Sequence, residues 1–393
     1  MSAPVVGTAI PWTPGWAPEA VDDLRARLRS TRRALSSFGH AWSEGTDPSY
    51  LTGLLAYWAD GFDFAQGEAE VARHPWFEAD VACGAQSPLR LRFIHLRGAE
   101  RTGGRAPLPL LLCHGWPDSA WRYQDVIDQL ADPASHGGDP DESFDVVVPD
   151  MPGYGFSPAP GQVIDSIGVA HAFAALMRDL GYERYAVAGG DIGSSVARFI
   201  ALEHPADVVA VHRMDAGIPV FAGEPATLSA EERAFLDAAA AWAAREGAYA
   251  AMHRTKPATI AAALSDSPAG LAAWTVEKLH AWSDSSHGPV GGFTRDAILS
   301  LLTTVWTENS TGPSMRMYRA NAAIPADQHS RRVEVPSGFS FFPADLLTPP
   351  RAWLERIANV TSVSYPGSGG HFAPREAPEV YAQELRAFFR SSW

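Results

Sequence analysis

The sequence of 393 residues predicts an α/β protein with a mostly parallel, doubly wound sheet. Short apolar runs end in loops that contain Gly, Pro or Asp, and helical patterns separate several of these runs. Buried strands that alternate with helices are typical of a parallel sheet covered by helices on both faces. The expected strands span Leu89–Phe93, Leu108–Cys113, Phe144–Val148, Tyr185–Ala188, Val208–His212, Val335–Phe342 and Val360–Tyr365.

Residues 1–88 are expected to form a helical N-terminal extension. Apolar residues recur there at helical spacing in two stripes. The second helix has a start signal at Asp47-Pro48 and a stop signal at Gly61. The stripes consist of Val21, Leu24, Leu28, Thr31 and Leu35, and of Leu51, Leu54, Leu55 and Trp58.

At Leu89 the apolar period changes, so residues 89–216 are expected to form the first part of the core. The run Leu89–Phe93 alternates between apolar and charged residues, as a half-exposed strand does. A later helix ends at Gly181, a residue type suited to the C′ position. The apolar stripe of that helix is Val169, Phe173, Leu176, Met177 and Leu180.

Residues 217–332 contain short helical stripes rich in Ala and Trp, and no clear strand. We expect this helical insertion to form a lid over the edge of the sheet where the strands end, because open α/β sheets bind ligands at that edge. Residues 333–393 are expected to complete the core with two strands and a final helix, which carries Tyr381, Leu385, Phe388 and Phe389.

The composition excludes several classes of function. Because 31 basic residues stand against 45 acidic ones, the net charge of −14 argues against general binding to nucleic acid or anionic membranes. Two cysteines are too few for a disulfide framework or a cysteine-built metal site. The N-terminus lacks a signal-peptide pattern, and no apolar stretch approaches about 18 residues, so we expect a cytoplasmic protein without a membrane anchor.

The most specific local motif is Gly189-Gly190-Asp191-Ile192-Gly193, between an expected strand and an expected helix. A sharp turn with small residues two before and two after its centre is the nucleophile elbow of α/β-hydrolases, here with Asp191 in place of serine. Taken alone, the pentapeptide is also compatible with a Gly-rich turn whose Asp caps the next helix.

Two further loops complete the pattern. His114-Gly115-Trp116-Pro117 follows a buried strand, at the place where this fold supplies a backbone donor to an oxyanion hole. The two expected donors are the backbone N–H groups of Trp116 and Ile192. His114 is expected to have a structural role. His371 lies on a Gly-rich loop after the last strand, the position of the general base. The acid that orients it is expected to be Asp345, with Asp215 as the competitor.

Taken together, the motifs closely resemble the epoxide hydrolases of the microsomal and juvenile-hormone type over essentially the whole chain. The motifs are HGWP (114–117), MPGYGFS (151–157), GGDIGS (189–194), TKPATIAAALSDSPAGLAAW (255–274), VPSGFSFFPADLL (335–347) and GGHFA (369–373). The resemblance implies an α/β-hydrolase fold with a helical lid and extension, and two lid tyrosines, Tyr249 and Tyr318, that donate hydrogen bonds to the epoxide oxygen. It implies an epoxide and water as reactants, and neither a metal nor an organic cofactor.

The mechanism implied is attack by Asp191 on one ring carbon, followed by hydrolysis of the resulting ester by a water that neutral His371 activates. Two departures from the family concern Ile192, where relatives usually carry Trp, and Asp345, where vertebrate microsomal members carry Glu. A haloalkane dehalogenase is the alternative enzyme, although it usually needs the Trp that Ile192 replaces. A non-catalytic ligand-binding homologue is the third hypothesis.

The identity of the substrate is open at this stage. The lid aromatics Trp274, Trp282 and Trp306 are candidates for lining an apolar pocket, and each is also a candidate for the lid core. The Ala- and Arg-rich composition, without the membrane anchor of microsomal members, is similar to the soluble bacterial branch. A role in secondary-metabolite (enediyne or polyketide) biosynthesis is expected by that analogy, and a homodimer is left open.

Overall fold

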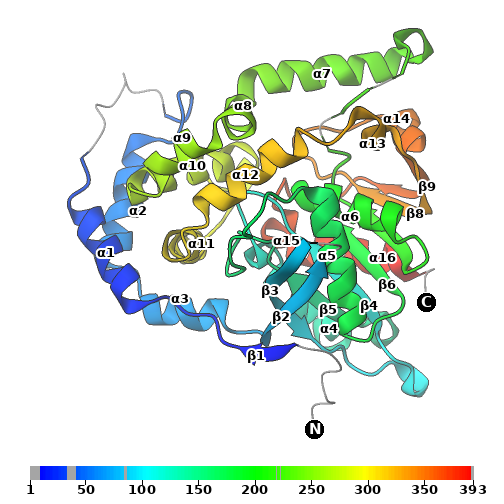
Figure 1. Ribbon diagram of the computed structural model, residues 1–393, viewed down its shortest axis with the longest axis horizontal. Helices are drawn as coiled ribbons and strands as arrows, with labels where there is room; N and C mark the ends of the chain where they lie inside the picture. Colours follow the sequence, from blue (N-terminus) through cyan, green and yellow to red (C-terminus); the bar gives the residue numbers. More distant parts are fainter. Residues whose placement is uncertain (1–8, 33–40, 84–85, 218, 222, 391–393) are drawn as a thin grey trace.

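The computed structural model describes residues 9–32, 41–83, 86–217, 219–221 and 223–390. In these ranges nine strands form one sheet in the order β1-β2-β3-β5-β4-β6-β7-β8-β9 (Figure 1). Strands β1, β2, β3 and β5 pair antiparallel in succession, and all pairs from β5 to β9 are parallel. The strands are β1 (Ile10–Trp12), β2 (Trp76–Cys83), β3 (Gln86–Leu96), β4 (Leu108–Cys113), β5 (Phe144–Pro149), β6 (Tyr185–Gly189), β7 (Val208–Arg213), β8 (Val333–Ser340) and β9 (Ala358–Ser364).

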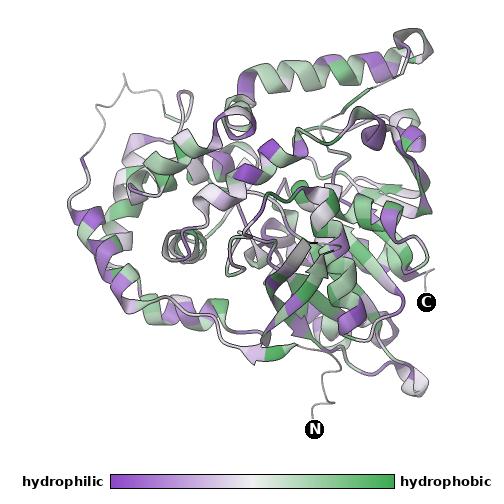
Figure 2. Cartoon of the chain, in the orientation of Figure 1, coloured by the Kyte–Doolittle hydropathy of each residue, from purple (hydrophilic) through white to green (hydrophobic). Residues whose placement is uncertain are grey.

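The predicted α/β architecture is confirmed, and the core lies on the central strands. Every residue of β5 and β6 is buried, and Figure 2 shows these strands as mostly hydrophobic. The helices that pack along the sheet are α4 (Ile127–Ala131), α5 (Ser166–Asp179), α6 (Ile192–Glu203), α14 (Arg351–Ile357), α15 (Ala373–Glu376) and α16 (Pro378–Phe389). The predicted end of α5 is also confirmed, since Gly181 adopts a φ of 86° just beyond it.

The N-terminal segment is not wholly helical, which corrects the expectation for residues 1–88. Strands β1 and β2 lie within it, and β2 pairs with β3. The acidic residues of β2 find their partners only on that neighbouring strand, where Arg90 lies 2.9 Å from Asp80 and Arg92 lies 3.0 Å from Glu78. This pairing stabilises a segment that also has a strand period of its own, because residues 77–81 alternate between apolar and acidic residues.

Three helices precede β2, namely α1 (Pro18–Arg29), α2 (Pro48–Asp60) and α3 (Phe64–Val71). The start and stop of α2 are as predicted, because the Asp47 side chain accepts a hydrogen bond from the amide of Tyr50 and Gly61 is the C-cap. Helix α1 ends before Thr31, and Leu35 of its predicted stripe lies outside the described residues. Helices α1 and α2 pack on the lid helix α10 (Pro268–Ala281), and α3 packs on the lid helix α11 (Arg295–Thr307) (Figure 1).

Between β7 and β8 the described residues form helices and no strand, which agrees with the expected lid. Figure 1 shows α8 to α12 gathered at one end of the sheet, while α7 projects from the body. The lid helices are α7 (Ala230–Glu246), α8 (Ala248–Thr255), α9 (Pro257–Leu264), α10 (Pro268–Ala281), α11 (Arg295–Thr307), α12 (Thr311–Asn321) and α13 (Ala326–Ser330). None of the helices in the described ranges is both long enough and apolar enough to cross a membrane.

Candidate active site

Asp191 occupies a strained turn between β6 and α6. Its φ of 58° is positive, which is unfavourable for a residue with a side chain and is held only by its surroundings. The two flanking glycines leave no room for larger residues. A Cβ on Gly193 would lie 2.0 Å from the carbonyl oxygen of Cys113, and one on Gly189 would lie 2.4 Å from the carbonyl oxygen of Gly193. The turn therefore presents the Asp191 carboxylate at the end of the strand.

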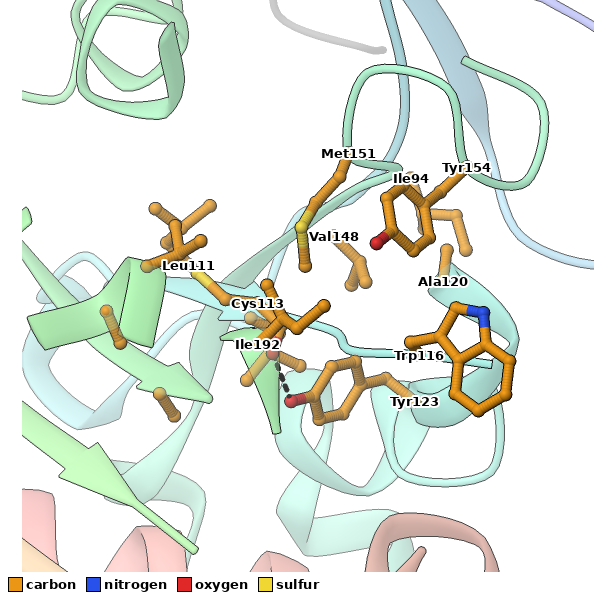
Figure 3. Packing of buried hydrophobic residues seen from close by; sticks show 14 of the residues in the cluster. Ile94, Leu111, Cys113, Trp116, Ala120, Tyr123, Val148, Met151, Tyr154 and Ile192 are labelled. Carbon is orange, nitrogen blue, oxygen red and sulfur yellow. Dashed lines mark hydrogen bonds between the residues drawn. The ribbon is translucent and has the colours of Figure 1, made fainter. Parts of the chain in front are cut away.

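The floor beneath this turn is rigid and apolar. The hydroxyl of Tyr123 donates a hydrogen bond of 2.8 Å to the carbonyl oxygen of Cys113 at the end of β4 (Figure 3). Figure 3 also shows the side chain of Ile192 within the same hydrophobic cluster, where it is 9% exposed. At the position where the resemblance leads one to expect Trp, this chain thus has an aliphatic residue that packs into the core.

The loop after β4 contacts the Asp191 carboxylate directly. The amide of Trp116 donates a hydrogen bond of 2.9 Å to Asp191 Oδ1. A Cβ on Gly115 would lie 2.4 Å from Asp191 Cβ, so only glycine allows this approach. The second expected donor, Ile192, is the first residue of α6, and among the described contacts its amide does not reach the carboxylate. The Trp116 amide therefore already donates a hydrogen bond to the carboxylate, whereas the Ile192 amide is a second donor at the N-terminus of α6 that does not.

His114 of the same loop has a structural position. It is fully buried, its Nε2 accepts a hydrogen bond of 2.9 Å from the amide of Met151, and its Nδ1 lies 2.9 Å from the carbonyl oxygen of Gly115. Because Nε2 is an acceptor, Nδ1 carries the proton and is the donor to that oxygen. Both ring nitrogens thus hold the loop in place, which agrees with the structural role expected for His114.

His371 lies between two carboxylates. Its Nδ1 is 2.7 Å from Asp345 Oδ1, and its Nε2 is 3.2 Å from Asp191 Oδ2. The loops meet because Ala344 and Gly370 form an isolated parallel bridge. Burial opposes the charged imidazolium, but the carboxylates of Asp345 and Asp191 outweigh it and raise the pKa of His371 to about 10. The side chain is therefore protonated at neutral pH while both carboxylates are charged.

The nucleophile candidate is kept ionised by its neighbours. Burial disfavours the charged Asp191 carboxylate, yet the hydrogen bond and charge of His371, the charge of Arg122 and the Trp116 amide together lower the pKa of Asp191. Arg122 is fully buried and donates a hydrogen bond of 2.7 Å to the carbonyl oxygen of His371. Its guanidinium lies 2.7 Å from the carboxylate of Asp118, which offsets the cost of burying the charge.

Asp215, the competing acid, has a different place. Its Oδ2 accepts a hydrogen bond of 2.7 Å from the amide of Asp191, and its Oδ1 accepts one of 2.7 Å from the amide of Gly217. It contacts the backbone of the turn at Asp191 and makes no hydrogen bond with His371 among the described contacts. The structure therefore brings Asp345 to the imidazole, and leaves Asp215 to hold the backbone of the turn.

The two lid tyrosines lie side by side near the carboxylate. Tyr249 on α8 is 6% exposed, and its ring centroid is 5.9 Å from that of partly buried Tyr318 on α12. Burial is the largest cause that raises the pKa of both hydroxyls, and the charge of Asp191 raises both further. Both groups consequently remain protonated at neutral pH and are able to donate hydrogen bonds.

The three candidate tryptophans have separate places. Trp274 lines a small cavity beside Trp116. Trp282 is fully buried next to His371 and accepts a hydrogen bond of 2.8 Å from the His371 amide through its backbone carbonyl. Trp306 packs under the guanidinium of Arg27 from the N-terminal segment and does not line this cavity. The cavity is lined by Trp116, Pro117, Asp118, Tyr154, Gly155, Leu271, Trp274, Thr275, Val305, Ser310, Thr311, Ser314 and Met315.

Two buried polar residues near the tyrosines are not among the site residues predicted from the sequence. His253 packs edge to face against Tyr318, with ring centroids 4.9 Å apart, and its Nε2 accepts a hydrogen bond of 3.3 Å from Trp274 Nε1. Lys278 is 6% exposed and lies over the ring of Tyr249. The signal that could have found them is helical spacing, since His253 follows Tyr249 by four residues and Lys278 follows Trp274 by four.

No metal site competes with this arrangement in the part of the chain that the structure describes, where no three His, Cys, Asp or Glu side chains gather as ligands. The site itself offers three kinds of chemical group. It holds an ionised carboxylate with one oxygen fixed by an amide, an imidazole paired to a second carboxylate, and two hydroxyl donors opposite. This set is suited to a covalent ester intermediate.

Comparison with known proteins places the chain among related enzymes. Residues 10–123 match the family described as "Epoxide hydrolase N terminus", and residues 109–267 match "alpha/beta hydrolase fold". A putative epoxide hydrolase of Stigmatella aurantiaca is 34% identical over 94% of this chain and 82% of its own length. Epoxide hydrolase 1 of Oryctolagus cuniculus is 32% identical over 94% of this chain and 86% of its own length.

Solved structures give the same result. The juvenile hormone epoxide hydrolase of the silkworm Bombyx mori superposes with a TM-score of 0.87 and 25% identity, covering 98% of this chain and 95% of that one. The epoxide hydrolase of Aspergillus niger superposes with a TM-score of 0.83 and 29% identity, covering 99% of this chain and 98% of that one. The likeness thus includes the N-terminal segment and the lid as well as the core.

Proposed function

The chain belongs to the epoxide hydrolases of the microsomal and juvenile-hormone type, and we propose that it converts an epoxide to a vicinal diol through a covalent ester on Asp191. The observation that carries this mechanism is that the two oxygens of the Asp191 carboxylate have different partners. Oδ1 accepts the Trp116 amide hydrogen at 2.9 Å, whereas Oδ2 faces His371 Nε2 at 3.2 Å. One oxygen is thereby held for the later oxyanion, and the other is available for attack.

In the first step Asp191 Oδ2 forms a bond to one ring carbon as the bond from that carbon to the epoxide oxygen breaks. The oxygen gains negative charge and accepts a hydrogen bond and then a proton from Tyr249 or Tyr318. An epoxide is strained but has a poor leaving group, so these donors lower the barrier only as the charge develops. The product of this step is a neutral hydroxyalkyl ester.

In the second step a water attacks Asp191 Cγ and His371 takes its proton. Imidazole acts as a base only when it is neutral. In the enzyme before ester formation, however, the carboxylates of Asp345 and Asp191 favour the imidazolium form of His371. Since the Asp191 charge is one cause of the raised pKa of His371, ester formation removes that cause, and the imidazolium proton returns to the tyrosinate that ring opening leaves. Neutral His371 then takes a proton from the attacking water, and the oxyanion forms on Oδ1 beside the Trp116 amide. Collapse of this intermediate expels the diol oxygen, which takes the proton back from His371, and the Asp191 carboxylic acid then gives its proton to His371, which restores the resting ion pair.

The test is to trap the ester. His371→Gln removes the base and keeps a side chain of similar length, so ester formation proceeds while hydrolysis stops. Intact mass after addition of styrene oxide should rise by the full mass of one epoxide, and peptide mapping should locate the adduct on Asp191. A folded variant that binds the epoxide and forms no adduct would contradict the covalent mechanism.

The finer biological role stays a prediction from the resemblance. We propose a cytoplasmic enzyme that acts on a secondary metabolite, and the cavity beside Trp116 supports an uncharged substituent because Asp118, its one charged residue among those described, is paired with Arg122. A panel of epoxides with chiral analysis of the diols tests this role. A preference for small detoxification substrates over polycyclic natural-product epoxides would contradict it.

A further inference from the structure

Helix α10 presents one stripe of three large side chains to the site. Trp274 and Lys278 are four residues apart and therefore lie on one face of the helix, and Trp282, four residues further on, is its C-cap. The indole of Trp274 donates to His253, and the backbone carbonyl of Trp282 accepts from the His371 amide. Lys278, between the two tryptophans, lies over the ring of Tyr249, and the Trp282 ring is tilted against the same ring with centroids 5.2 Å apart.

Lys278 and Trp116 both lie against the ring of Tyr249. The Trp116 and Tyr249 rings are stacked, with centroids 5.2 Å apart and an interplanar angle of 14°, so one face of Tyr249 is covered. The ammonium of Lys278 lies over the same ring, 4.8 Å from its centroid. The Tyr249 ring is thereby packed against both an indole and a cation.

The ammonium group is buried and has few other partners. Lys278 is 6% exposed, and its Nζ lies 2.5 Å from the carboxylate of Glu277, whose side chain is 25% exposed. The same ammonium lies 5.6 Å from the ring centroid of Trp282. A cation removed from water over an aromatic face interacts more strongly with the ring than an exposed one does.

We propose that Lys278 is a positioning residue for ring opening. It fixes the direction of the Tyr249 hydroxyl, and its charge over the ring stabilises the negative charge that grows on the phenol oxygen as the hydrogen bond to the epoxide strengthens. This inference rests on the proposed role of Tyr249 as a donor. Since Trp282 adjoins His371, a purely structural role would instead disturb ester hydrolysis as well.

The test measures ester formation and ester hydrolysis separately, by single-turnover rapid quench with styrene oxide. Lys278→Met keeps the apolar stem and removes the charge, and should slow ester formation about tenfold while hydrolysis changes less than about twofold. Lys278→Arg keeps a cation and should restore most of the rate. Glu277→Gln keeps the ammonium and should be at least as fast as the parent. If Lys278→Met does not fold, Lys278→Gln is the second neutral variant.

A double-mutant cycle identifies the route of the effect. In a Tyr249→Phe background, Lys278→Met should slow ester formation by less than about twofold more, because the hydroxyl through which it acts is gone. Three results would overturn the role of Lys278 and leave that of Tyr249 intact. They are an undiminished effect of Lys278→Met in that background, an equal slowing by Glu277→Gln, and a normal rate for Lys278→Met when Tyr249→Phe is slow. A normal rate for Tyr249→Phe overturns the donor role of Tyr249, and the inference with it.

Discussion

Removing one lid hydroxyl tests the ring-opening step. In Tyr249→Phe or Tyr318→Phe the developing alkoxide loses one donor, and a hydrogen bond to a charged group contributes about 1.5–3 kcal/mol. At about 1.36 kcal/mol for each factor of ten, ester formation should slow roughly 10- to 150-fold in each variant. Because burial keeps both hydroxyls protonated, the loss should be nearly constant between about pH 6 and pH 8.

Rapid-quench measurement of ester formation is the assay, with Tyr154→Phe as the matched control. Tyr154 is also buried near Asp191, but its hydroxyl already donates a hydrogen bond of 2.8 Å to the carbonyl oxygen of Ser314. Its removal should cost about 1 kcal/mol of stability and leave ester formation within about threefold of the parent. Rates within about twofold of the parent for both Tyr249→Phe and Tyr318→Phe would refute the reasoning, as would an equal loss in the control.

Three further outcomes are expected. Asp345→Asn should slow ester hydrolysis about 10³-fold or more and ester formation less than about tenfold, measured by rapid quench, since Asp345 orients His371; equal losses in both steps would contradict this. The raised pKa of His371 contributes stability that is complete below its unfolded pKa of about 6.5 and is lost as pH rises through about 10. Urea denaturation should therefore show that the parent loses stability between about pH 7 and pH 10 more steeply than His371→Gln does, and parallel pH profiles would oppose it. Gly193→Ala places a Cβ 2.0 Å from the backbone oxygen of Cys113 and should destabilise the fold by about 3 kcal/mol or more, whereas an unchanged melting temperature would count against the elbow geometry.

The sequence was sufficient for those elements whose signals are local. The ends of α2 follow from Asp47 and Gly61, and the buried strands follow from short apolar runs that stop at turn residues. Strand β2 is not among the predicted strands, although residues 77–81 alternate between apolar and acidic residues as Leu89–Phe93 does. The two helical stripes before Gly61 favour one helical interpretation of the whole segment, and the arginines of β3 that pair with Glu78 and Asp80 lie outside it.

The site divides in the same way. Asp191, Trp116 and His371 lie on loops whose glycines and order along the chain indicate where they must come together, and the geometry brings them within hydrogen-bonding distance. Lys278 is not predicted, because a lysine on a lid helix is ordinarily a surface residue and only tertiary packing buries it, over the ring of Tyr249. Trp282 is a candidate both for the pocket and for the lid core, and the structure buries it beside the His371 loop, where its backbone carbonyl accepts the His371 amide hydrogen.

The central claim is that Asp191, and not water, attacks the epoxide. A single turnover of the parent enzyme in water labelled with heavy oxygen, with enzyme in excess over styrene oxide, tests it most directly. The mechanism predicts an unlabelled diol, because its new oxygen comes from Asp191 Oδ2, and a peptide containing Asp191 that carries the label from the attacking water. Labelled diol with unlabelled Asp191 in that first turnover would contradict the account.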